Sequence, residues 1–458
     1  MTQSPLRRAT LAVAMLTSFM TPFMGASVNL ALPRIAADLN LDAVMLTWIA
    51  TAYILAAVVF LLPFGRLADI HGRKRVFSAG VTGFLLGSIV AALARTGTTL
   101  IAARVIQGLG GGMVFGTATA ILISVYPREQ RGRVLGWSVA SVYLGLSLGP
   151  PIGGWIVGEI GWRAIFWINA GLCACSLGLT LGYVHAEWKE AAGEAFDLAG
   201  AVAYALSVIA LMLGLAALPS GRGAAFLALA AAGIALFIRW EARSVSPLLD
   251  VRLLRDNRVF AFSNLAALIN YAATFAVGFV LSLYLQYVKA LTPQQAGLVM
   301  MSQPVMQALC SPLAGRLSDR IEPRLLSSAG MALTAAGLAS LSFLSEGSGL
   351  AHIGASLLVL GVGFGLFSSP NTNAVMGSVD RRQYGLASAV LSTMRMLGQM
   401  ISMGMAALVV ALFVGRTTIG PANQAAFVQG ARLLLGAFAA LSVAGIFASL
   451  SRGKVHAS

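Results

Sequence analysis

Fourteen apolar segments of about 20 residues each, long enough to cross about 30 Å of hydrocarbon as helices, dominate this chain. Charged residues make up only 10% of the 458 positions, against about 25% in a soluble domain, so lipid must cover most of the surface. The segments lack the short apolar–polar alternation of membrane β-barrels. We therefore predict an all-α polytopic membrane protein whose helices begin near residues 9, 45, 75, 98, 133, 163, 197, 223, 258, 295, 324, 350, 385 and 425.

The positive charges predict the orientation of these helices. With the N-terminus on the cytoplasmic side, most of the 31 Lys and Arg fall in cytoplasmic loops and tails, as the positive-inside rule requires. This group includes Arg73, Lys74, Arg75, Arg381, Arg382, Arg452 and Lys454. We expect both termini in the cytoplasm and the protein in the plasma membrane of a bacterial or archaeal cell. Because the bases are spread over many loops, topology explains the net charge of +15, and no nucleic-acid partner is expected.

Residue types that catalyse reactions or bind metals are scarce in the apolar segments. Cys173, Cys175 and Cys310 lie singly in predicted helices, and the 4 His lie in loops or tails. No nucleophile with a base, and no group of metal ligands, follows from this distribution. We therefore expect no metal, no cofactor and no enzymatic activity.

A short motif occurs twice and divides the chain. Residues 65–75 read Gly-Arg-Leu-Ala-Asp-Ile-His-Gly-Arg-Lys-Arg, and residues 315–320 read Gly-Arg-Leu-Ser-Asp-Arg. The copies lie about 250 residues apart, and at about 30 residues for each helix with its loop this leaves eight helices between them instead of six. The spacing predicts two six-helix bundles, residues 1–190 and 258–458, with two extra helices and a charged segment over residues 191–257.

The first copy of the motif joins one acid to several bases at a tight turn. Asp69 near a helix end can form a partly desolvated charge network with Arg73, and Gly72 permits a sharp turn beside them. A basic loop that only sets topology would explain the bases but not the acid or the glycines. We interpret the two copies as a conformational latch formed by Gly65, Asp69, Gly72, Arg73, Gly315 and Asp319.

Arg104 lies inside a predicted span, close to Gln107 and to glycines at positions 108, 110 and 111. A guanidinium at membrane depth is costly and normally faces the bundle interior or water. If the span begins near Thr98, Arg104 lies less than two turns deep. It then either faces the interior with a functional role or reaches outward to the interface.

Glycines and a proline recur at fixed spacing in the fifth apolar segment. They fit the pattern G-(x)8-G-(x)3-G-P-(x)2-G-G at Gly136, Gly145, Gly149, Pro150, Gly153 and Gly154. Three of the glycines share one helical face and allow close helix crossing, and the proline bends the helix by removing a backbone hydrogen bond. We predict a pliable, close-packed joint between the two bundles, with generic small-residue packing as the alternative.

These features together resemble the major facilitator superfamily, in particular its fourteen-helix drug:proton antiporters, over nearly the whole chain. The loop at 65–75 is similar to the superfamily pattern G-x-x-x-D-x-x-G-R-(K/R)-(K/R), and the Arg104 region resembles its fourth-helix motif. The fifth-helix pattern is similar to the antiporter signature, and Asn29-Leu-Ala-Leu-Pro33 resembles the first-helix motif of the fourteen-helix group. The resemblance implies the major facilitator fold, a latch role for Asp69, and export by exchange.

The chain departs from that group in its first helix. The group commonly has an Asp about five residues before the Asn, where this sequence has Met24. None of the 16 acids falls in the middle of a predicted span. The remaining candidates for proton coupling are Asp69, Glu159 at a helix end, and Arg104 as a charged residue within a span. Either coupling uses such a group or the protein is not proton-coupled in the usual way.

A polar stripe marks the segment that begins near residue 385. Its members recur at spacings of 4, 3, 4 and 3, which places Ser388, Ser392, Arg395, Gln399 and Ser402 on one face of a helix. The stripe predicts a cavity lining, because a buried guanidinium without an acid needs water or an anion; helix adhesion by Ser and Gln is the alternative. We expect the substrate to contact Met24, Asn29, Asn270, Tyr271, Gln303, Asn371, Ser392, Arg395 and Gln399.

The features combine into one functional prediction, a secondary active transporter that works by alternating access. We expect export of amphipathic small molecules in exchange for protons. Because Arg104 and Arg395 have no matching membrane acids, anionic, zwitterionic, neutral or lipid-like substrates are favoured over dications. The alternatives are a lipid or solute translocator without proton coupling and a non-transporting membrane sensor on the same scaffold. The expected partners are the substrate, protons and the lipid bilayer, and the protein is expected to be a monomer.

Overall fold

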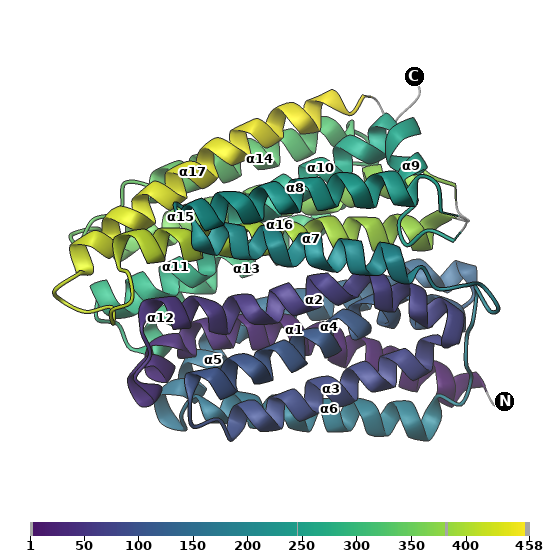
Figure 1. The fold of residues 1–458 in the computed structure, drawn as a ribbon, viewed down its shortest axis with the longest axis horizontal. Helices are drawn as coiled ribbons and strands as arrows, with labels where there is room; N and C mark the ends of the chain where they lie inside the picture. The colour runs from purple at the N-terminus through teal and green to yellow at the C-terminus, as the bar shows by residue number, and fades with distance from the viewer. Residues whose placement is uncertain (1–2, 245, 381–382, 454–458) are drawn as a thin grey trace.

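The computed structural model describes residues 3–244, 246–380 and 383–453 as one long helical bundle (Figure 1). Arg381, Arg382 and Lys454, assigned above to the cytoplasmic side, lie outside the described residues. The first helix begins and the last helix ends at the same end of the bundle, on the right of Figure 1. We call this the termini end and the opposite one the distal end.

The helices follow the predicted apolar segments, and each predicted start lies close to the start of a helix. In chain order they are α1 Gln3–Leu39, α2 Ala43–His71, α3 Arg73–Ala92, α4 Gly97–Val125, α5 Arg128–Glu159, α6 Arg163–Tyr183, α7 Leu198–Ala217, α8 Gly221–Glu241, α9 Val251–Asp256, α10 Arg258–Thr274, α11 Val277–Leu283, the π-helix η1 Tyr284–Val288, α12 Pro293–Met300, α13 Ser302–Leu317, α14 Pro323–Leu341, α15 Leu350–Gly377, α16 Tyr384–Phe413 and α17 Gln424–Ser451.

The number of candidate membrane spans is smaller than predicted. In the described part of the chain, 12 helices are long and apolar enough to cross a membrane, against the fourteen expected. The consecutive pair α12 and α13 falls short because the helix is interrupted at Met301. Pro304 lacks an amide hydrogen and its ring collides with the carbonyl four residues earlier, which accounts for the break. Helix α14 has 19 residues but is not among these candidate spans.

The helices form two groups that lie one above the other in Figure 1, with α1–α6 below and most of α10–α17 above, while α12 lies at the left at the level of α1 and α2. Helices α7 and α8 cross the front, and α7 lies along the seam between α2 and α16. The Tyr204 hydroxyl of α7 donates to the Val58 carbonyl of α2 at 3.1 Å, and Leu215 of α7 packs on Gly404 of α16. The extra helices were predicted to lie outside the core. Helix α8 does, but α7 packs against both groups.

The helix after residue 258 bends where α10 ends and α11 begins. The amide of Ala276, left free by the bend, donates to the Ser402 Oγ of α16 at 3.0 Å. Ser402 is completely buried. It was expected on the cavity-lining stripe, but a broken helix needs internal partners for its freed backbone groups, and Ser402 supplies one.

Arg452, counted above among the bases of the cytoplasmic tail, is instead completely buried directly after α17. Its guanidinium donates to Ser263 Oγ (3.2 Å), Asn371 Oδ1 (2.9 Å), the Pro323 carbonyl (3.1 Å) and Ser449 Oγ (2.9 Å). Burial lowers the pKa of Arg452 to about 10, which still leaves it charged at neutral pH. One cation therefore ties α10, α14, α15 and α17 together at the termini end.

Replacing Arg452 by Ala should destabilise the protein, because each buried partner left without a hydrogen bond costs about 1–3 kcal/mol. Scanning fluorimetry in detergent should record a lower melting temperature. Arg432→Ala is the matched control, since Arg432 is exposed on the same helix and should melt like the wild type. Equal melting temperatures for all three proteins would show that the network does not stabilise the fold.

Candidate functional site

Polar contacts between the two helix groups lie toward the distal end and the middle of the bundle. Ser282 Oγ of α11 donates to the Asn29 carbonyl of α1 at 2.7 Å, and the Asn29 side chain faces Gly278 of the same α11. Nearer the middle, the Tyr143 hydroxyl of α5 donates to Ser311 Oγ of α13 at 2.8 Å. Asn29 was predicted to bind substrate, but here its backbone joins the two groups.

Most glycines of the α5 signature pack this helix on α1, inside one group. A Cβ added to Gly145, Gly149 or Gly153 would lie closer than 3.0 Å to atoms of α1. Ser27 Oγ of α1 donates to the Gly149 carbonyl at 3.2 Å, which adds a polar contact to this crossing. This face holds two neighbouring helices close together and is not the predicted joint between the bundles.

The contact between the groups falls at the end of the signature. A Cβ at Gly154 would collide with the Pro293 carbonyl at the start of α12, and the Pro150 carbonyl fills the space that a side chain at Gly297 would need. Gly136, at the other end of the signature, has nothing within 4 Å of its Cβ position. The close-packed joint is therefore shorter than predicted and involves Gly154 and Pro150.

Arg395 is half-buried on α16, facing α10 and α15. Its guanidinium donates to Thr372 Oγ1 at 2.7 Å and lies 5.7 Å from the centre of the Tyr271 ring, which packs edge-on against Phe364. The Arg395 Nε has no partner, and no carboxylate in the described part of the chain pairs with this side chain. Since Arg395 is half-buried and its guanidinium has Thr372 as its side-chain hydrogen-bond partner, it keeps hydrogen-bonding capacity for an anionic or polar ligand.

Other predicted binding residues share this partial exposure. Ser392 and Gln399 flank Arg395 by about one helical turn on α16, and Gln303 begins α13 beside α15. All three are half-buried. They remain able to contact a ligand that reaches Arg395.

Three predicted binding residues are buried within helix packing instead. Asn371 donates its amide to the Ser263 carbonyl at 3.1 Å and accepts from Arg452. Asn270 is completely buried, and neither polar atom of its side chain has a partner among the described residues. Met24 is 1% exposed within the apolar core. Because these side chains are covered, they do not line an accessible path in this conformation.

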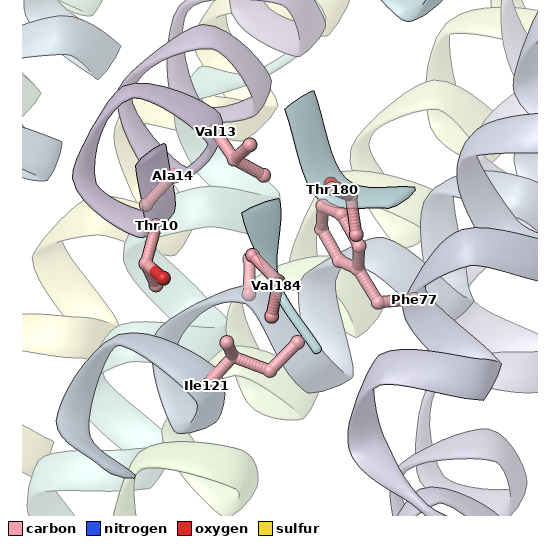
Figure 2. A pocket seen from close by; sticks show the side chains of 8 residues that line it. Thr10, Val13, Ala14, Phe77, Ile121, Thr180 and Val184 are labelled. Atoms are coloured by element: carbon pink, nitrogen blue, oxygen red, sulfur yellow. The ribbon is translucent and has the colours of Figure 1, made fainter. Parts of the chain in front are cut away.

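The small pocket in Figure 2 lies inside the first helix group. It has room for about one water molecule. Its walls are mostly apolar, and Thr10, its polar side chain on α1, already donates to the Leu6 carbonyl. The pocket therefore offers no site for a substrate.

Arg104 faces the interior of the first group and does not reach outward, although both readings were open from the sequence. It is 2% exposed, donates to the Ile49 carbonyl of α2 at 3.1 Å and to Gln107 Oε1 at 2.8 Å, and lies over the Tyr53 ring. The Gln107 amide in turn donates to Ser88 of α3. Arg104 is therefore held by neutral partners between helices of one group, away from Arg395.

Asp69 and Arg73 form an ion pair at the turn from α2 to α3, with 2.9 Å between Oδ1 and Nε. Gly72 between them has a φ of 126°, in the region that favours glycine, and a Cβ there would also collide with the side chain of Glu187. Gly65 has nothing within 4 Å of its own Cβ position, but its backbone approaches α4, where the Gly65 Cα lies 3.3 Å from the Cβ position of Gly116.

The segment between α6 and α7, which we call the acidic strap (residues 185–197), folds back over this turn. The Arg73 amide donates to the Trp188 carbonyl and the Ala191 amide donates to the Asp69 carbonyl, both at 3.0 Å. These two backbone hydrogen bonds dock the strap on the latch. The sequence suggested only that this segment separates two domains.

The strap supplies carboxylates to the basic loop. Glu190 pairs with Arg73 at 2.6 Å, Glu194 pairs with Arg66 at 2.5 Å, and Glu187 accepts from the backbone amide after Arg73 at 2.8 Å. Arg73 therefore has acidic partners on both sides, one from α2 and one from the strap. The sequence signal that could have revealed this contact is the spacing of Glu187, Glu190 and Glu194 by three and four residues, in a chain that also has a basic loop at residues 65–75.

The remaining predicted latch and coupling residues are not gathered into this network. Asp319 is exposed and makes no ion pair with a described residue, and Gly315 is only loosely packed against Ser369, at 3.7 Å from its Cβ position. Glu159 is exposed at the distal end of α5. In this conformation the first copy of the motif is therefore ion-paired, whereas Asp319 of the second copy is not ion-paired with a described residue.

We expect Glu190→Gln to loosen the strap modestly, because Glu190 is 67% exposed and an exposed ion pair contributes under about 1 kcal/mol. Amide hydrogen exchange over residues 187–197, followed by mass spectrometry, should quicken by up to about fivefold. Asp69→Asn should act on the same amides, whereas Glu346→Gln, far from the strap, should not. Unchanged exchange in the first two variants would contradict a docking role for these ion pairs.

Gly154→Val should separate α5 from α12, because the added side chain meets the Pro293 backbone, which cannot move aside easily. Spin labels at the distal ends of the two helices should then report longer and broader distances. Gly136→Ala is the control, since its Cβ enters open space and Ala favours the helix by about 1 kcal/mol. Unaltered distances in Gly154→Val would show that the two groups do not depend on this contact.

Comparison with known proteins identifies the family. The chain matches the Major Facilitator Superfamily over residues 14–403, and again over residues 263–452. It is 29% identical to the riboflavin transporter RibZ of Clostridioides difficile, over 83% of each chain. It is 33% identical to the multidrug resistance protein Stp of Mycobacterium tuberculosis, over 85% of this chain and 73% of that protein.

The fold agrees with this assignment. The crystal structure of the human organic anion transporter MFSD10 superposes with a TM-score of 0.64, covering 98% of this chain and 99% of that one at 15% identity. At this identity the likeness concerns the fold alone. With the helical architecture and the family match together, the chain belongs to the Major Facilitator Superfamily and is a multi-pass membrane transporter, not an enzyme.

Proposed function

We propose that this protein exports amphipathic small molecules across the plasma membrane by alternating access, in exchange for protons and as a monomer. The observation that carries the proposal is Arg395, a half-buried cation whose guanidinium donates to Thr372 and which no acid of the described chain neutralises. A membrane protein keeps such a group where water or a ligand can reach it.

The substrate class follows from the charge and the surroundings of Arg395. A fixed cation in a low-dielectric site favours anionic, zwitterionic or polar neutral ligands and repels cations. The aromatic faces of Tyr271 and Phe364 beside it suit the apolar part of such a molecule. Amphipathic substrates, including lipid-like ones, fit both properties.

The names of relatives support this class. RibZ is named a riboflavin transporter, and riboflavin is an uncharged aromatic with a polar tail. Stp is named a multidrug resistance protein, in keeping with export. Both are relatives over most of this chain, so a related substrate range and direction are reasonable for this protein.

Alternating access is supported by where the two helix groups touch. The contacts through Gly154 and Ser282 close the bundle toward the distal end, and the close backbone approach of α5 and α12 provides a point about which the groups can rotate. In the proposed topology the termini end is cytoplasmic, as the basic loops require. The broken pair α12–α13 and the 19-residue α14 serve as two further spans, which brings the total to fourteen.

Arg395→Ala should selectively weaken binding of anionic substrates, by about tenfold, while a neutral amphiphile keeps its affinity. Competition binding with one anionic, one neutral and one cationic amphiphile measures this, followed by transport in proteoliposomes with an imposed pH gradient. Arg395→Lys keeps the charge and should retain part of the preference. Arg432→Ala, which removes an exposed cation elsewhere, is the matched control.

Two outcomes would contradict the proposal. If the wild type prefers the cationic amphiphile and Arg395→Ala leaves the ranking unchanged, Arg395 does not line the binding site. If the pH gradient leaves transport unchanged, protons are not exchanged and the uncoupled translocator becomes the better description.

A further inference from the structure

Glu241, the last residue of α8, is a carboxylic acid that helix packing buries. It is 3% exposed, whereas no other described acid is buried. Its Oε2 accepts from the Leu249 amide at 2.9 Å. Its Oε1 is buried without a hydrogen-bond partner. An ionised carboxylate in this position would leave one charged oxygen unsolvated, which is costly.

Asp197, the N-cap of α7, stands next to that oxygen. Asp197 Oδ2 and Glu241 Oε1 lie 2.9 Å and 2.6 Å from the same point, the Cβ position of Gly200. Because Gly200 has no side chain, nothing separates the two carboxyl groups there. Two like charges so close, with no base between them, strongly favour a proton on one of the pair.

The hydrogen-bond donors decide which of the two is ionised. Asp197 accepts from the Gly200 amide at 2.8 Å, from Trp240 Nε1 at 2.9 Å and from Ser244 Oγ at 3.1 Å. These donors stabilise its charged form. The free Oε1 of Glu241 has no such donor, so the proton belongs there.

The other charged groups near this pair do not neutralise it. Arg239 and Arg243 are each two residues from Glu241 in the sequence, but both side chains are exposed. Asp250 caps α9 through the Arg252 amide, and Glu194 is reached through Ser246 and pairs with Arg66. From the α7 side, Asp197 is the charged group that faces Glu241.

We propose that Glu241 and Asp197 form a proton-binding site at the base of the α7–α8 hairpin. Glu241 Oε1 holds the proton, Asp197 stays ionised, and the proton exchanges with water at the termini end. Loss of the proton would place two negative charges beside Gly200 and push the ends of α7 and α8 apart.

The position of the site allows the protonation state of Glu241 to influence the helices that we propose move during transport. Helix α7 lies along the seam between α2 and α16. Ser246, which follows α8, donates to Glu194 of the acidic strap at 3.2 Å, and Glu194 holds Arg66 of α2. A change of charge at Glu241 therefore acts on a helix between the two groups and on the strap over the latch.

Dicyclohexylcarbodiimide tests the proposal, because it adds to protonated carboxyl groups in apolar surroundings and leaves a stable adduct. In the wild-type protein we expect mass spectrometry to find the adduct on Glu241 at about pH 6, with labelling that falls as the pH rises. Glu241→Gln should lose the adduct, and Glu346→Gln, which alters an exposed acid, should label like the wild type.

The role of Asp197 is tested by Asp197→Asn, which keeps a helix-capping side chain but removes the neighbouring charge. The midpoint of Glu241 labelling should move down by about one pH unit, since a like charge no longer favours the protonated form. An unlabelled Glu241 in the folded wild type, or a midpoint unaffected by Asp197→Asn, would overturn the proposal. Labelling is measured without transport, so its failure would leave the export proposal standing.

Discussion

Polar groups within the hydrocarbon layer must find partners inside the protein, and the arrangement of this bundle depends on that constraint. Arg104 and Arg452 are both buried, yet each is held by carbonyl, amide and hydroxyl oxygens. Each thereby fixes several helices relative to one another. Arg395 differs because it is only half-buried and its guanidinium makes one side-chain hydrogen bond, to Thr372, which is why we propose it as the cation that a ligand reaches.

Close backbone contact determines where the two helix groups can move. The α1–α5 crossing is held by three glycines within one group, whereas Gly154 and Gly297 bring the backbones of α5 and α12 together between the groups. Glycine at such a contact lets the two helices slide or rotate at close range without side chains between them. The antiporter signature therefore combines a rigid crossing and a joint in one helix.

Charge at the termini end is arranged unevenly. The first copy of the repeated motif is ion-paired by Asp69 and by Glu190 of the acidic strap, whereas Asp319 in the second copy is exposed and free of ion pairs with described residues. The same strap leads to Asp197 and, through Ser246, touches the loop after Glu241. Latch, strap and hairpin thus form one connected electrostatic unit beside the seam.

Hydropathy, charge distribution and short motifs in the sequence determined the membrane class, the position of nearly every helix, the family and the ion pair Asp69–Arg73, because these depend on local composition and short spacing. Only the tertiary structure decided which polar side chains are covered. Ser402 shares a helical stripe with accessible residues, but its side chain accepts from the Ala276 amide at the broken helix, and the Asn371 side chain accepts from Arg452. Likewise, the strap on Arg73 and the pairing of Glu241 with Asp197 join residues far apart in sequence. No periodicity along one helix encodes such contacts, since they depend on how separate helices pack.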